Sequence, residues 1–306
     1  MATLNQTAIK IIIRGEYGDP FAVLGPHVVK QGRQEALAIR AFLPWVEKVT
    51  VVPVGSDQTA RPMDPLHRDG LFEAVFPGYR SPFAYRLEVM DGQGVVRQVE
   101  DPYRFASTLS DYDLYLIGEG RHDRIYEKLG AHLCTLEGVA GVRFAVWAPN
   151  ARRASVVGDF NRWDGRVHAM RLHPGNGIWE IFVPGVAEGA LYKFEVLSRT
   201  NGLLALKADP CAFAFEEHTP RTASEVASLA YDWGDADWMA TRARKNALDG
   251  PIAIYEVHLG SWRRKEGDQF LTYRELAEEL GRYVKEMGYT HVELLPVTEH
   301  PFYGSW

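Results

Sequence analysis

The chain has 306 residues, of which 46% are hydrophobic and 24% charged, with a formal net charge of −6. This composition is typical of a soluble globular chain with room for two or three domains. The acidic balance argues against a nucleic-acid partner, which would favour clustered Lys and Arg. No stretch approaches the ~20 apolar residues that cross a bilayer, so we expect no membrane partner either.

The N-terminal segment lacks the features of a secretory signal. Its only apolar core, residues 11–13, is bracketed by Lys10 and Arg14 and is too short. Cys134 and Cys211 lie 77 positions apart in no metal-binding or redox spacing. We therefore expect two reduced thiols in a cytoplasmic protein, with no metal and no cofactor.

The chain contains a tandem repeat with an offset of 105 to 108 residues. Three blocks recur in the same order: GLFEAVFPG (70–78) as GIWEIFVPG (177–185), AYRLEV (84–89) as LYKFEV (191–196), and DPYRF (101–105) as DPCAF (209–213). Each copy is rich in short runs of Val, Ile, Phe, Tyr and Trp, separated by Gly, Pro, Asp and Asn. This pattern predicts two β-sandwiches of the immunoglobulin-like type.

The two copies differ most in one loop. Copy two has VVGDFNRWDG at 156–165, whereas residues 53–70 of copy one contain no aromatic side chain. A flat indole can cover the apolar face of a sugar ring, while amide and charged groups bond the hydroxyls. Trp163, Asn161 and Lys193 are therefore candidate substrate-binding residues. Alternatively, Trp163 packs under its own loop and Lys193 is an ordinary surface lysine.

A different pattern begins after residue 250. Residues 252–259 form a near-continuous apolar strand of the kind that is buried in parallel sheets. Thr272 and Glu275 form a capping box that predicts a helix, and Gly288 predicts its end. Residues 291–297 are the next strand, so the segment predicts one right-handed βαβ unit.

The expected fold is mainly β: two tandem immunoglobulin-like sandwiches followed by the first βαβ unit of an incomplete (β/α)8 barrel. The domain boundaries that we expect are 1–112 for copy one, 113–133 for a linker with a short helix, 134–222 for copy two, 223–250 for a helical connector, and 251–306 for the start of the barrel.

Several of these segments resemble one enzyme family. YEVHLGSWRR (255–264) and MGYTHVELLPVTEHPFYGSW (287–306) resemble the first two barrel strands of 1,4-α-glucan branching enzymes, in the α-amylase superfamily. GDPFAVLGPH (18–27) is similar to the start of their extra N-terminal domain. GDFNRWDG, GIWEIFVPG and LYKFEV resemble their glucan-binding sandwich.

This resemblance implies a hexosyltransferase of glycogen biosynthesis. Such enzymes cleave an α-1,4-glucan through a glycosyl-enzyme intermediate and transfer the segment to a 6-hydroxyl, which makes an α-1,6 branch. The family's catalytic carboxylates follow later barrel strands, so we expect no catalytic residue here and an inactive chain. The implied partner is an α-glucan such as glycogen or amylose.

Local residues do not replace the missing carboxylates. Glu256, Glu293 and Glu299 lie near His258 and His300 in the sequence. However, retaining catalysis requires two carboxyl groups about 5–5.5 Å apart around a sugar, and two strands cannot build that pocket.

Two alternatives remain at this point. One is a non-catalytic pair of glycogen- or starch-binding modules with a vestigial barrel tail, and the other is a truncated product that folds only in part.

Overall fold

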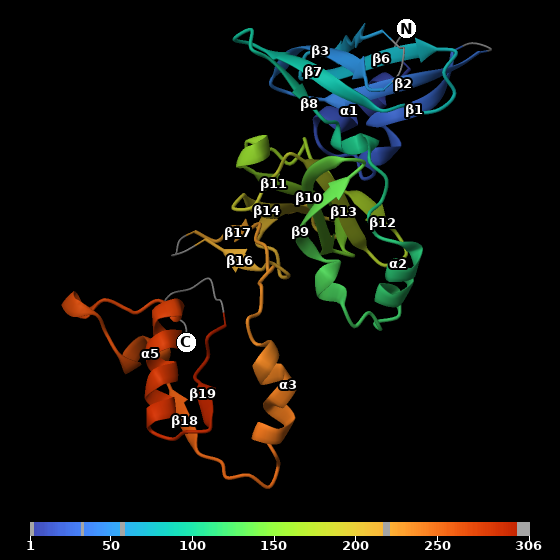
Figure 1. Ribbon diagram of the computed structural model, residues 1–306. Helices are drawn as coiled ribbons and strands as arrows, with labels where there is room; N and C mark the ends of the chain where they lie inside the picture. Colours follow the sequence, from blue (N-terminus) through green and yellow to red (C-terminus); the bar gives the residue numbers. More distant parts are fainter. Residues whose placement is uncertain (1–2, 32–33, 56–58, 217–220, 299–306) are drawn as a thin grey trace. The chain divides into compact units, whose positions relative to one another are not determined.

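The computed structural model describes residues 3–31, 34–55, 59–216 and 221–298 (Figure 1). The chain divides into two compact units, residues 1–229 and residues 230–306. The first unit contains both copies of the repeat, and the second contains the βαβ pattern.

The first copy is a β-sandwich preceded by a helix. Helix α1 (Gln6–Ile13) begins after Asn5, whose side chain accepts a hydrogen bond from the Ala8 N–H at 2.8 Å. The two sheets have the strand orders β1-β2-β6-β5 and β4-β3-β7-β8. The remaining bounds are η1 (Pro20–Ala22), β1 (Gly25–Gln31), β2 (Gln34–Phe42), β3 (Val46–Pro53), β4 (Arg61–Pro62), β5 (Asp64–His67), β6 (Leu71–Pro77), β7 (Tyr85–Asp91), β8 (Val96–Val99) and η2 (Pro102–Arg104).

The second copy repeats this architecture. Its sheets have the orders β12-β13-β10-β9 and β11-β14-β17-β16, with β15 also paired to β14. Its elements are α2 (Asp111–Gly118), η3 (Ile125–Glu127), β9 (Gly130–Leu136), β10 (Val139–Trp147), β11 (Ala151–Gly158), η4 (Asp159–Asn161), β12 (Arg171–His173), β13 (Ile178–Pro184), β14 (Leu191–Ser198), β15 (Leu204–Lys207), β16 (Ala214–Phe215) and β17 (Ser224–Glu225). The prediction of a mainly β chain with sandwich domains is confirmed.

The structural repeat extends beyond the strands. Strands β1 and β9 begin 105 residues apart, and so do helices α1 and α2. The short helix expected between the copies is therefore α2, and it occupies in copy two the place that α1 occupies in copy one. Strand β9 begins at Gly130, inside the segment expected to be a linker.

Buried polar pairs are repeated as well. The Tyr85 hydroxyl donates to Asp101 Oδ2, and the Tyr192 hydroxyl donates to Asp209 Oδ2, both at 2.6 Å. In each copy the same aspartate also accepts a backbone N–H two residues downstream, at 3.0 Å for Asp101 and 2.8 Å for Asp209. These bonds tie the DP turn to the strand that carries the tyrosine, which explains why both blocks recur together.

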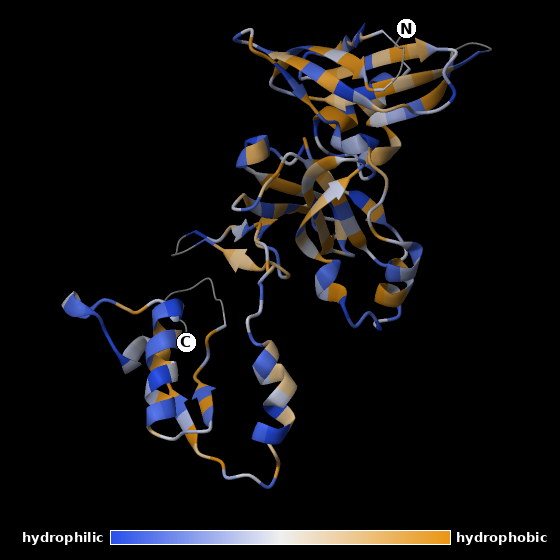
Figure 2. Ribbon diagram, in the orientation of Figure 1, coloured by the Kyte–Doolittle hydropathy of each residue, from blue (hydrophilic) through white to orange (hydrophobic). Residues whose placement is uncertain are grey.

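The sheets pack by alternating apolar side chains inward, visible as alternating colours along the strands in Figure 2. In copy one the layer between the sheets is built from Leu37, Ile39, Phe72 and Leu87, each at most 4% exposed. In copy two Trp179 is fully buried, as its position between apolar neighbours predicts, and its indole N–H donates to the Ala148 carbonyl at 3.0 Å.

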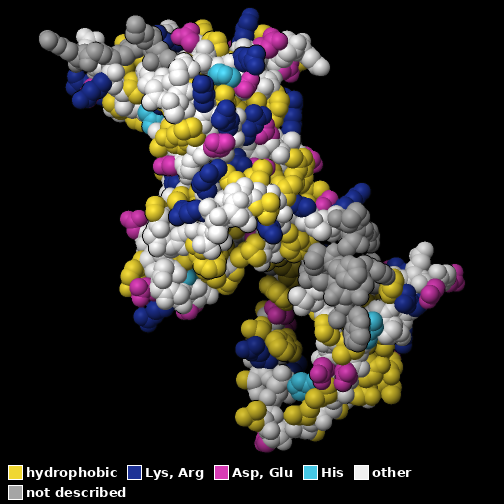
Figure 3. Space-filling view, turned by 180° about the vertical axis from the view of Figure 1, so that it is seen from behind, with side chains coloured by type: hydrophobic (Ala, Val, Ile, Leu, Met, Phe, Trp, Pro, Cys, Tyr) yellow, Lys and Arg dark blue, Asp and Glu magenta, His cyan; other side chains and the backbone are white. Residues whose placement is uncertain are grey.

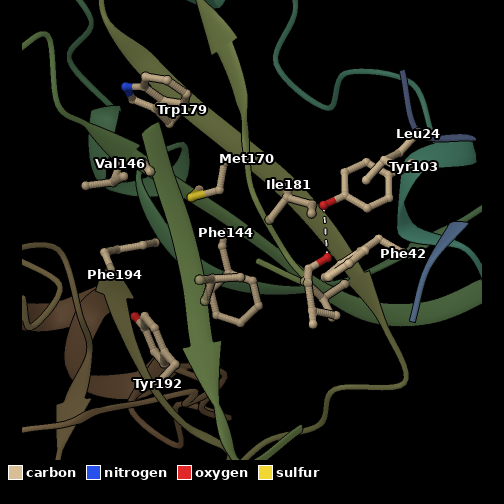
Figure 4. Packing of buried hydrophobic residues seen from close by; sticks show 14 of the residues in the cluster. Leu24, Phe42, Tyr103, Phe144, Val146, Met170, Trp179, Ile181, Tyr192 and Phe194 are labelled. Carbon is tan, nitrogen blue, oxygen red and sulfur yellow. Dashed lines mark hydrogen bonds between the residues drawn. The ribbon is translucent and has the colours of Figure 1, made fainter. Parts of the chain in front are cut away.

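One hydrophobic core joins the two copies. Phe42, Leu24 and Tyr103 of the first copy belong to the same cluster as Phe144 and Ile181 of the second (Figure 4). The Tyr103 hydroxyl also crosses between the copies and donates to the Val167 carbonyl at 2.9 Å. The two sandwiches are therefore packed as one body.

The second unit contains a parallel strand pair and a helix. β18 (Ile254–Val257) pairs in parallel with β19 (His291–Leu294), and α5 (Tyr273–Glu286) connects them with Leu276 and Leu280 buried. Thr272 and Glu275 form the expected capping box, and Gly288 has φ +81°. The unit also contains α3 (Ala236–Lys245), α4 (Leu259–Trp262) and η5 (Glu266–Asp268). Among the described residues, no helix is long and apolar enough to span a membrane.

The buried Asp101 makes stability depend on pH. Burial raises the pKa of this carboxyl from 3.8 to about 6, although its hydrogen bonds with Tyr85 and Tyr103 oppose the shift. A carboxyl whose pKa is raised in the folded state lowers stability as the pH rises from about 4 to about 6.

We expect Asp101→Asn to remove this fall in stability with rising pH, because asparagine does not titrate. The melting temperature of the variant, relative to the unsubstituted protein, should rise by several degrees between pH 4.5 and pH 7.5. Asp123→Asn, at an exposed position, is the control. Its melting temperature should differ from that of the unsubstituted protein by the same amount at both pH values. A constant difference for Asp101→Asn as well would show that the buried carboxyl does not titrate in this range.

The boundary between the two units should be the first site of limited proteolysis. Cleavage is expected between residues 226 and 236, where the chain has no strand or helix, because exposed irregular backbone is cut first. Mass spectrometry should show a resistant product that ends there. Early cleavage within residues 139–198 would contradict this boundary.

Candidate functional site

The loop after β11 is shaped by glycine and left-handed backbone. Gly158 ends the strand, and a Cβ at this position would lie 2.3 Å from the Leu191 carbonyl oxygen. After the η4 turn, Arg162 and Trp163 both have positive φ, at 55° and 59°. Two consecutive non-glycine residues in this region are unusual, and a bulky side chain makes the second one a true outlier. The loop therefore holds backbone strain at Trp163, of the kind that gathers at functional sites.

Two hydrogen bonds hold Trp163 in this strained conformation. Its backbone N–H donates to the Gly158 carbonyl at 2.9 Å, and its indole Nε1–H donates to Asp159 Oδ1 at 2.8 Å. The side chain is half-buried. The ring is therefore fixed in orientation while part of its surface stays open to solvent.

Asn161 is placed differently from the sequence-based expectation. Its side chain is 1% exposed. Its Oδ1 accepts the Gly158 N–H at 3.0 Å, and its Nδ2 donates to the Val156 carbonyl at 2.9 Å and to His168 Nδ1 at 3.0 Å. Both of its amide hydrogens and its oxygen are bonded to protein groups, and the side chain is buried, so Asn161 shapes the loop from inside.

Lys193 lies on the strand beside the loop. In the β11–β14 pairing it is opposite Val157, directly before the loop begins. Its Nζ donates to the Thr222 hydroxyl at 2.8 Å. No hydrogen bond or cation–π contact joins Lys193 to Trp163 within the described residues, so the two share one end of the sandwich without touching through polar groups.

The end of the loop is held by an ion pair and by a hydrogen bond from an arginine to the backbone. Arg166 donates to Asp164 Oδ1 at 2.9 Å and to Oδ2 at 2.6 Å, and the Arg153 guanidinium donates to the Gly165 carbonyl at 3.1 Å. Burial would raise the pKa of the Asp164 carboxyl, but the hydrogen bonds from Arg166 outweigh burial and keep it below its usual value. The carboxylate is thus charged and committed to Arg166.

The interior residue that sequence reasoning missed is His168. It is 8% exposed, burial lowers its pKa to about 4, and it lies beside Phe160 with ring centroids 5.7 Å apart. A lone histidine seven positions after Asn161 carries no signal in the sequence. Only the tertiary structure connects the two side chains.

The other candidates lie in the second unit. Glu256 and Glu293 are exposed and occupy paired positions on β18 and β19. Glu299 and His300 lie outside the described residues. Within the described residues, no cluster of three or more His, Cys, Asp or Glu could hold a metal ion.

Two family models match the two sandwiches. Residues 128–212 match carbohydrate-binding module 48, described as the isoamylase N-terminal domain. Residues 5–103 match the N-terminal domain of the alpha-1,4-glucan branching enzyme GlgB. The fold and these matches define a class: a tandem β-sandwich protein whose second sandwich, which contains the Trp163 loop, matches a carbohydrate-binding module.

Full-length comparisons extend this assignment. The chain is 51% identical over 301 residues to the 1,4-alpha-glucan branching enzyme GlgB of Rhodospirillum rubrum, and 53% identical over 303 residues to that of Rubrobacter xylanophilus. The alignments cover 98% and 99% of this chain and 40% of each relative. The chain belongs to the 1,4-alpha-glucan branching enzyme GlgB family and spans about 40% of the length of these relatives.

One of the solved structures that the chain matches is an apo pullulanase from Klebsiella pneumoniae. The alignment covers 86% of the present chain and 32% of the pullulanase chain, with 16% sequence identity and a TM-score of 0.43.

The different roles of Asn161 and Trp163 can be tested with two variants. Asn161→Ala should lower the free energy of unfolding by about 1–3 kcal/mol, because it leaves the buried Gly158 N–H without an acceptor. Trp163→Gly should leave stability within about 1 kcal/mol of the unsubstituted protein, because glycine adopts positive φ without strain. Urea unfolding of both variants tests this, and a large loss for Trp163→Gly would show that the indole is a packing residue.

Proposed function

We propose that this chain is the glucan-binding part of a 1,4-α-glucan branching enzyme of glycogen biosynthesis, and that its second sandwich holds α-glucan at the Trp163 loop. The observation that carries the proposal is the strained, doubly anchored Trp163 inside the region that matches carbohydrate-binding module 48. Strain at a half-exposed indole is hard to explain by packing alone, since a relaxed loop could bury the ring more completely.

In this proposal each loop residue has a separate task. The Trp163 ring is the platform for the apolar face of a glucosyl unit, fixed in place by the Asp159 carboxylate. Lys193, on the adjacent strand, is placed to bond a hydroxyl at the rim. Asn161 is a positioning residue, because it holds the loop from inside.

We further propose that the second unit is the beginning of a (β/α)8 barrel. Two observations support this: β18 and β19 pair in parallel, and a connection that contains α5 joins them. Apolar side chains are also left uncovered on this unit, including Ile254 at 54% and Leu294 at 46% exposure, and Figure 3 shows such side chains gathered on its surface. Strands of a complete parallel barrel are covered on both faces.

In this proposal the branching reaction itself is carried out by the longer proteins of the family. A branching reaction breaks an α-1,4 bond, holds the released segment on a carboxylate and passes it to a 6-hydroxyl. The contribution of the present residues is to bring the glucan to the enzyme. A cytoplasmic location is part of the same proposal, supported by two free cysteines, Cys134 and Cys211.

Binding at the loop is tested by native gels cast with glycogen. The chain should be retarded, and Trp163→Ala should weaken the apparent affinity about tenfold, since a well-placed aromatic contact is worth up to about 1.5 kcal/mol. Trp147→Ala is a matched control, because Trp147 is 61% exposed on the same sandwich and lies outside the loop. Equal retardation of both variants would overturn the loop as the binding site.

Catalysis by the chain alone is tested with amylose and iodine. Incubation with the purified chain should leave the iodine spectrum unchanged, because the two exposed carboxylates on paired strand positions, Glu256 and Glu293, form no enclosed sugar site. A clear spectral shift, retained after further purification, would contradict this expectation.

A further inference from the structure

A cavity of about 310 Å³ lies between the two sandwiches. Copy one supplies the end of β2 and the facing strands β7 and β8, and copy two supplies the end of β13, Phe160 and His168. Small-molecule sites begin at about 300 Å³, so the cavity is large enough for a small ligand and too small for a long chain.

Aromatic side chains form much of its wall. Phe42, Trp45 and Tyr103 come from copy one, and Phe160 comes from the same loop that carries Trp163. The Trp45 ring also lies under the guanidinium of Arg162, 4.8 Å from the ring centroid. Aromatic faces in a concave site suit the apolar C–H faces of a pyranose.

A side-chain donor on the wall of this cavity has no protein partner among the described residues. Because the Gly158 N–H donates to Asn161 Oδ1, the other amide atom of Asn161 must be the nitrogen. That nitrogen donates to His168 Nδ1, so Nδ1 carries the lone pair and the proton of the neutral ring is on Nε2. His168 is 8% exposed and lines the cavity, and its Nε2 has no hydrogen-bond partner among the described residues. Nε2 is not one of the buried side-chain atoms that lack a partner, so it keeps access to solvent and can donate to a ligand oxygen.

The carboxylates at the cavity are already committed. Asp101 accepts from Tyr85 and from the Tyr103 backbone, and Glu100 accepts from Arg86 at 2.7 Å and Arg104 at 3.0 Å. The polar groups left for a ligand are donors: His168 Nε2–H and the side chain of Arg97, which is exposed on β8. Two acidic residues at the wall disfavour an anion, so the acceptors that fit are the hydroxyl and ring oxygens of a neutral sugar.

We propose that the cavity between the two sandwiches is a second saccharide site, which takes the end of an α-glucan chain between Trp45, Phe160 and His168. The choice of α-glucan as the sugar rests on the proposed function, whereas the cavity and its free donor do not. The site uses the inner side of the loop whose outer side carries Trp163, and it needs both copies of the repeat.

The two sites can be observed separately by NMR of tryptophan indole N–H groups in the full chain. The resonances of Trp45 and Trp163 are assigned by Trp45→Phe and Trp163→Phe, and maltotriose is the probe. We expect maltotriose to shift both resonances, and the Trp45 shift to persist in Trp163→Ala.

A second experiment blocks the cavity with a larger side chain on its wall. Val99→Phe should abolish the Trp45 shift and leave the Trp163 shift in place, because Val99 lines the cavity. Val96→Phe is the matched control: Val96 is on the same strand, is 55% exposed and lies outside the cavity lining. Should Val99→Phe fail to fold, Arg97→Ala at an exposed position is expected to weaken the Trp45 response about fivefold.

Each outcome decides between the proposals. A Trp163 shift without a Trp45 shift overturns the cavity site and leaves the proposed function standing. A Trp45 shift without a Trp163 shift supports the cavity and overturns the loop site, and absence of both overturns both. A Trp45 shift that survives Val99→Phe, or that inorganic phosphate produces and maltotriose does not, also overturns the saccharide site.

Discussion

The arrangement of the first unit depends on one shared hydrophobic core. Phe42 and Tyr103 of the first sandwich are buried in the same cluster as Phe144 and Ile181 of the second, and the Tyr103 hydroxyl bonds the Val167 carbonyl across the junction. Dispersion and burial between these side chains, together with the buried hydrogen bonds of the Tyr103 hydroxyl, make the two copies one body. The Trp163 loop begins from this body at Gly158, and the cavity lies against it.

Duplication explains why the two sandwiches share their framework but differ in their loops. The Tyr85–Asp101 and Tyr192–Asp209 bonds occur at corresponding places, as do the helices α1 and α2. Buried polar pairs are retained because loss of one partner leaves the other unsatisfied. Loops carry no such constraint, and the GDFNRWDG loop of copy two contains a half-buried indole on a strained backbone.

The roles of individual residues follow from burial and hydrogen bonding rather than from residue type. Asn161 has the side chain expected of a sugar ligand, yet it is fully committed inside the loop. His168 has no sequence signal, yet the same Asn161 bonds its Nδ1 and so fixes its tautomer, with the ring proton on Nε2. One buried amide therefore supports the loop on both of its sides.

The sequence by itself determined the tandem repeat, the β character of both copies, the burial of Trp179 and the capped helix at Tyr273–Glu286. Each of these follows from a local period or a short spacing, which a sequence shows directly. Only the tertiary structure decided that α2 repeats α1, that Asn161 points inward, and that Phe160 and His168 border a cavity shared with copy one. These facts depend on contacts between residues far apart in the chain, and on which loop atoms lack a partner after folding, so no local pattern records them.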